Sequence, residues 1–67
     1  MNIILVLYDG NTFMDRVEFQ ANNILVYSKN SIARFGRLKQ WKGEFKNITI
    51  MEDSIRVQFQ FVERIKS

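Results

Sequence analysis

The side chains best suited to binding a ligand are concentrated in residues 34–46, where five cationic residues are interleaved with three aromatic ones. Lys and Arg neutralise phosphates and release counterions, and exposed aromatic rings give nucleobases a surface on which to stack. This combination predicts contact with nucleic acid, for which small all-β barrels with a basic, aromatic groove are a recurrent architecture. The residues expected to make that contact are Arg34, Arg37, Lys39, Trp41, Lys42 and Lys46.

A protein partner is the alternative, and it would use the same basic stretch or a free edge strand. Trp and Arg dominate the energetics of protein interfaces, and the positive charge favours an acidic protein. An edge strand can also pair with a partner strand or with a second copy of the chain, which would give a homodimer. The apolar residues of this stretch have a structural explanation as well: Phe35, Leu38 and Phe45 fit a core, and Trp41 fits either a core or an exposed interface.

Catalytic chemistry has few suitable groups in this chain. It contains no His and no Cys, which removes the usual general base, thiolate nucleophile and zinc ligands. Its three Gly residues are isolated from one another, so no glycine-rich phosphate loop is present. The seven carboxylates show no spacing typical of an acid–base pair. We therefore expect a non-enzymatic binding module with no catalytic residue, cofactor or metal ion.

The positive charge is unevenly distributed along the chain. The net charge is +3; residues 29–46 contribute 6 − 1 = +5, residues 1–28 contribute 1 − 3 = −2, and residues 47–67 contribute 3 − 3 = 0. The apolar run at Asn2–Tyr8 follows no positive segment and is too short for a signal peptide or a membrane span. We therefore expect a cytoplasmic protein with no membrane partner.

Length and composition predict one small globular domain, residues 1–67. Hydrophobic residues make up 46% of the chain, which is enough to form a core and is unlike a disordered segment. The bias toward Asn, Ile, Lys and Phe is compatible with a small inhibitor, adaptor or assembly protein of a phage, prophage or low-GC bacterium. A gene located outside any such neighbourhood would contradict that hypothesis.

The elements that would position the basic stretch are strands. In Ser54–Phe61, apolar residues alternate strictly with polar ones, a period of two that predicts a strand with one buried face. Asn2–Tyr8 is a nearly unbroken apolar run, typical of a central strand covered on both faces. Asp9-Gly10-Asn11 then predicts a hairpin turn into a second strand, Thr12–Gln20. Asp15 interrupts the apolar side of that strand, which predicts a position at the sheet margin or a bulge.

The middle of the chain is open to two interpretations. Ile24–Ser28 predicts a third strand, and the following residues form either a returning strand or a helix spanning 31–42. A helix would hold Gly36 in its interior at a cost of about 1 kcal/mol relative to Ala. An Asn-Ile start followed by an apolar run and a polar turn recurs at residues 2, 23 and 47, which favours repeated hairpins.

The sequence therefore predicts an all-β fold: a small antiparallel barrel or strongly bent sheet of five to six strands built from hairpins. The alternative is an α+β fold with one short helix at 31–42. The expected core consists of Ile4, Val6, Phe13, Val17, Phe19, Ile24, Val26, Ile48, Ile50, Ile55, Val57, Phe59 and Phe61.

Overall fold

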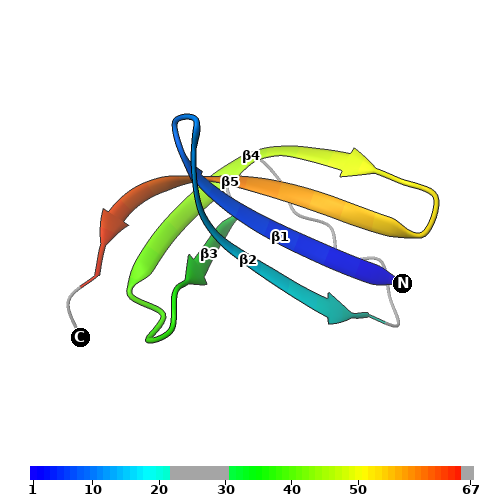
Figure 1. The fold of residues 1–67 in the computed structure, drawn as a ribbon, viewed down its shortest axis with the longest axis horizontal. Coiled ribbons are helices and arrows are strands. Elements are labelled where there is room, and N and C mark those ends of the chain that lie inside the picture. Colours follow the sequence, from blue (N-terminus) through cyan, green and yellow to red (C-terminus); the bar gives the residue numbers. More distant parts are fainter. Residues whose placement is uncertain (22–30, 66–67) are drawn as a thin grey trace.

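A computed structural model describes residues 1–21 and 31–65 of the chain. These residues form one five-stranded sheet (Figure 1). Its strands are β1 (Asn2–Asp9), β2 (Thr12–Gln20), β3 (Ile32–Phe35), β4 (Trp41–Ile50) and β5 (Ser54–Arg64). The all-β prediction is confirmed, and the α+β alternative is not supported because residues 31–42 form β3, a turn and the start of β4. The predicted strand Ile24–Ser28 lies outside the described residues.

The sheet has the strand order β2-β1-β5-β4-β3 and curls into a half-barrel (Figure 1). The chain-adjacent pairs β1–β2, β3–β4 and β4–β5 are antiparallel, as hairpins require. β1 and β5 pair in parallel, however, so the sheet is mixed. This pairing joins the first and last strands, which no hairpin connects, and a parallel pair needs such a long intervening connection.

The core lies on the concave face of the curled sheet, which we call the inner face. Ile3, Leu5 and Leu7 of β1 stand directly beside their parallel partners on β5. The fully or almost fully buried side chains of this face are Ile3, Leu5, Leu7, Phe35, Ile55, Val57 and Phe59.

Gly43 allows β4 to lie close against this core. A Cβ at this position would lie 2.7 Å from Leu7 Cδ1, 3.1 Å from Phe59 Cβ and 3.3 Å from Phe35 Cε1. These distances are shorter than ordinary contacts, so a side chain at Gly43 would require the Leu7 side chain to move and Phe59 to shift. The ring of Phe35 thereby packs edge-on against that of Phe59, with centroids 5.5 Å apart.

The predicted core is correct in part. Val6, Ile55, Val57 and Phe59 are buried, and Val17, Phe19 and Phe61 are half-buried against the inner core. Ile4 is half-buried on the outer face of the sheet, whereas Ile24 and Val26 lie outside the described residues. The prediction was wrong for three exposed residues, Phe13, Ile48 and Ile50, and it missed Ile3, Leu5 and Leu7. Phe35, which the sequence indicated only as a residue that fits a core, is fully buried.

A β-bulge explains why Phe13 is exposed. Leu7 pairs with Asp15, but Tyr8 pairs with Phe13, so Met14 is an extra residue in β2. The extra residue reverses the alternation, which moves Phe13 to the outer face while Met14 packs against the core. Both expectations for this strand are confirmed, because β2 is an edge strand and carries a bulge beside Asp15.

Asp15 also connects the two ends of the curled sheet. Its carboxylate Oδ2 accepts a hydrogen bond of 2.8 Å from the backbone N–H of Gly36, at the end of β3. β2 and β3 are the opposite edges of the sheet, so this contact brings the edges together at one end of the half-barrel.

Candidate functional site

The candidate site is the β3–β4 hairpin, Ile32–Glu44, whose turn is held by three hydrogen bonds. Lys39 N–H donates to the Gly36 carbonyl at 3.1 Å, and Leu38 N–H donates to Gln40 Oε1 at 2.8 Å. Gly36 N–H donates to Asp15, as described above. Gly36 and Lys39 both have a left-handed backbone, with φ of 92° and 57°. These hydrogen bonds use only backbone groups of the turn and the side chains of Gln40 and Asp15. The side chains of Arg37, Leu38 and Lys39 take no part in them and are exposed at the tip of the turn.

The hairpin also places two cations side by side. Arg34 of β3 and Lys42 of β4 are cross-strand partners on the outer face. Lys42 in turn stands opposite Glu63 of β5, with 3.7 Å between Nζ and Oε1. Exposed pairs of this kind contribute at most about 1 kcal/mol. Within the described part of the chain, Arg34 takes part in no ion pair.

The net positive charge of the chain is concentrated in the hairpin. Ile32–Glu44 contains Arg34, Arg37, Lys39 and Lys42 against Glu44, which sums to 4 − 1 = +3. This value equals the net charge of the whole chain, so the remaining residues sum to zero. A polyanion approaching the protein would therefore be drawn toward this hairpin.

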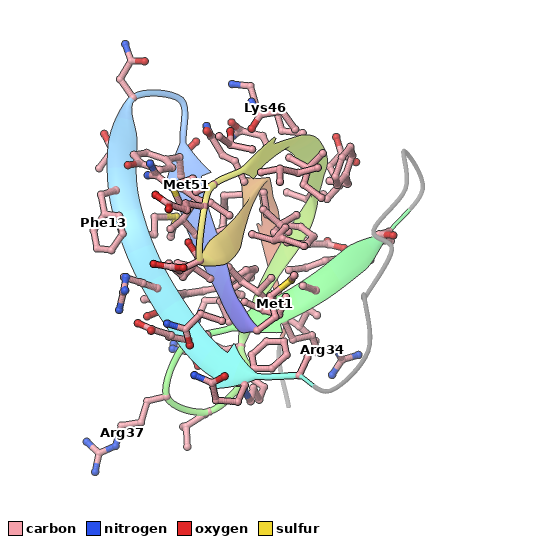
Figure 2. All side chains as sticks on the ribbon, turned by 90° about the vertical axis from the view of Figure 1, so that its right-hand side faces the viewer. Met1, Phe13, Arg34, Arg37, Lys46 and Met51 are labelled. Atoms are coloured by element: carbon pink, nitrogen blue, oxygen red, sulfur yellow. The ribbon has the colours of Figure 1, made fainter. Side chains whose placement is uncertain are left out.

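The six predicted site residues do not converge on one patch. Figure 2 shows Arg34 and Arg37 on different sides of the molecule and Lys46 at the opposite end of the view from Arg37. Lys46 is the extra residue of a β-bulge in β4, between Phe45 and Asn47, and lies beyond the hairpin. The structure thus brings Arg34 together with Lys42 and places Arg37 and Lys39 on the adjoining turn, but it separates Lys46 from both.

The aromatic residues of the basic stretch serve the core. Phe35 is fully buried, and Phe45 and Trp41 are half-buried against the core cluster. Trp41 therefore packs inward instead of presenting a free ring, which answers the question that the sequence left open. The stacking surface expected from these rings is largely absent from the hairpin.

An exposed aromatic ring occurs instead on the outer face of β1 and β2. Phe13 is 54% exposed, and its ring packs edge-on against Tyr8 with centroids 5.7 Å apart. Arg56 Nη2 lies 3.4 Å from the Tyr8 hydroxyl. Sequence reasoning missed this cluster because it assigned Phe13 to the core. The bulge predicted at Asp15 was the available signal for the exposure of Phe13. An extra residue in a strand moves the side chains that precede it in the strand to the opposite face of the sheet.

Residues 1–21 and 31–65 contain no group of three or more His, Cys, Asp or Glu side chains able to hold a metal ion. They also include no helix long and apolar enough to cross a membrane. Comparison with protein families, characterised proteins and solved structures found no match to this chain.

Proposed function

We propose that the chain is a small, non-enzymatic binding module whose ligand is nucleic acid, bound by the β3–β4 hairpin. The observation that supports this most is the concentration of charge: four cations on one hairpin, with Arg34 and Lys42 in adjacent register positions. Phosphates of one strand would contact this pair on the outer face and the turn cations Arg37 and Lys39 at the tip.

The chemistry of the hairpin favours contacts with the sugar–phosphate backbone over contacts with bases. Its cations can each displace a condensed counterion, an affinity term that carries no sequence information. Its aromatic residues are buried or half-buried, so base stacking contributes little. We therefore expect weak sequence preference and strong dependence on salt concentration.

Fluorescence anisotropy with labelled single- and double-stranded oligonucleotides at several salt concentrations tests this proposal. In Arg34→Gln/Arg37→Gln, the slope of log affinity against log salt for single strands should fall by about 1.4, at about 0.7 per lost phosphate contact. Arg16→Gln/Arg56→Gln is the matched control, because it removes the same charge from β2 and β5. No binding by the parent chain at low salt would refute the proposal, as would equal losses in both double variants.

An acidic protein partner is the second candidate, and the exposure of Leu38 favours it. Leu38 is 77% exposed at the tip of the turn, between Arg37 and Lys39. An apolar side chain flanked by two cations would suit an acidic surface with a small apolar pocket. By binding such a surface, this chain would act as an inhibitor, adaptor or assembly protein. Leu38→Ser separates the candidates: it should leave oligonucleotide affinity unchanged but weaken binding to such a protein. An oligonucleotide affinity that falls with Leu38→Ser would contradict the backbone-contact mechanism.

A further inference from the structure

The carboxylate of Asp15 uses both of its oxygens to hold backbone N–H groups. Oδ2 accepts the hydrogen bond from Gly36 N–H, and Oδ1 accepts one from Arg16 N–H, each at 2.8 Å. These two bonds fix the orientation of a side chain that is half-buried between the two edges of the sheet. Among residues 1–21 and 31–65, Asp15 takes part in no ion pair, so no cation neutralises its charge by direct contact.

Gly36 is the first residue of the turn that carries Arg37 and Lys39, and both polar groups of its backbone are occupied. Its N–H donates to Asp15, and its carbonyl accepts the hydrogen bond from Lys39 at 3.1 Å. Its φ of 92° is one that glycine adopts without strain. The amide group of Gln40 occupies the place of a side chain, because a Cβ at Gly36 would lie 2.8 Å from Gln40 Oε1. The backbone of the turn therefore has little freedom while Asp15 holds it.

We propose that Asp15 is the positioning residue of the candidate site: from β2 it holds the turn in the geometry in which Arg37 and Lys39 bind phosphate. The inference rests on the proposed function and adds to it a residue that lies outside the hairpin and contacts no ligand. A turn that is already held in its binding geometry loses less conformational entropy on association. Conversely, the affinity falls in proportion to the fraction of molecules that leave that geometry.

The charge of Asp15 and its hydrogen bond to Gly36 have opposite effects on binding. Asp15 is an anion beside a hairpin that would bind a polyanion, so charge alone predicts that its removal tightens binding. Loss of the hydrogen bond predicts the reverse, because the released turn spends part of its time in other conformations. Glu44 provides the matched control, since it is an exposed anion at the end of the same hairpin and takes part in no ion pair within the described ranges.

Fluorescence anisotropy with a labelled single-stranded oligonucleotide measures the difference between the two anions. Glu44→Ala should bind more tightly than the parent chain. Asp15→Ala removes the same charge but should bind roughly threefold or more weaker than Glu44→Ala, because the turn loses its acceptor. Asp15→Asn has the charge of Asp15→Ala but keeps an acceptor oxygen for the Gly36 N–H, so it should recover most of that loss.

Two outcomes of this measurement separate the inference from the proposed function. Equal affinities of Asp15→Ala and Glu44→Ala would overturn the positioning role and leave binding by the hairpin intact. No binding by the parent chain would refute the proposed function itself, and the positioning role with it.

A second comparison distinguishes positioning from a general loss of stability. In Arg37→Gln/Lys39→Gln the turn carries no cation to position, so adding Asp15→Ala should not weaken the remaining binding by Arg34 and Lys42 at low salt. Partial unfolding would instead weaken binding by the same factor whether or not the turn cations are present. A loss of that kind in both backgrounds would overturn the inference.

Discussion

Replacing Phe59 with Ala would remove the ring at which the aromatic contacts of the core meet. Phe59 is fully buried in β5. Its ring centroid lies 5.5 Å from that of Phe35 and 6.5 Å from that of Phe45, and both contacts are edge-on. The substitution would therefore leave a cavity between β3, β4 and β5 and abolish two aromatic contacts.

The magnitude of the effect follows from this environment. Phe-to-Ala substitutions in cores cost about 3–5 kcal/mol, and edge-on ring contacts are worth roughly 0.5–1.5 kcal/mol each beyond the area they bury. A folded chain of 67 residues has a total stability of roughly 3–10 kcal/mol. The loss is therefore a large part of the whole, and we expect Phe59→Ala to be close to unfolded without denaturant.

Urea unfolding, followed by circular dichroism and by Trp41 fluorescence, measures this loss. Phe13→Ala is the matched control, because it removes the same atoms from an exposed ring and should cost less than about 1 kcal/mol. Phe59→Leu keeps much of the apolar volume and should stay folded, with a loss of about 1 kcal/mol. Phe59→Ala with the midpoint of Phe13→Ala would refute the assignment of Phe59 to the centre of the core.

Two further substitutions test how the hairpin is held. Gly43→Ala should destabilise the fold by about 1–3 kcal/mol, because the new Cβ would lie 3.1 Å from the Cβ of the fully buried Phe59 and would displace the Leu7 side chain; a thermal melt identical to that of the parent would contradict this. Asp15→Ala should cost about 1–2 kcal/mol and speed exchange of the Gly36 amide, which loses its acceptor. Asp15→Asn should lose less, and an unchanged Gly36 exchange rate in Asp15→Ala would argue against the contact.

The hairpins could be predicted because their signals are local. Asp9-Gly10 marks the first turn, and Gly10 adopts a left-handed φ of 60° there. The alternation in Ser54–Phe61 identifies the buried face of β5 correctly. The parallel pairing of β1 with β5 could not be predicted in this way, because it joins residues far apart in the sequence and depends on the whole sheet.

Side-chain direction was harder to predict than strand position. Asn2–Tyr8 is apolar on both faces, so its sequence does not reveal that Ile3, Leu5 and Leu7 face the core. In β2, the bulge was predicted but its effect on Phe13 was not. Ile48 and Ile50 have the period of a buried face, yet the part of β4 that carries them extends beyond β3.

The candidate site was also predictable only in part, because some of its features are local in sequence and others depend on how the strands pair. The charge of the stretch was readable from the sequence. Phe35 and Phe45 were correctly expected to fit the core, whereas Leu38, which was expected there too, is exposed at the tip of the turn. The proximity of Arg34 to Lys42 depends on the β3–β4 register, and the separation of Lys46 depends on where β3 ends. Neither is set by spacing along the chain.

Mapping of amide NMR shifts during titration with a single-stranded oligonucleotide tests the proposed binding surface most directly. The changes should concentrate on residues 34–42, weaken as salt is added, and be small in Arg34→Gln/Arg37→Gln. Changes centred on Phe13 and Arg56, or on the β4 edge at Ile48–Ile50, would contradict the assignment of binding to the hairpin.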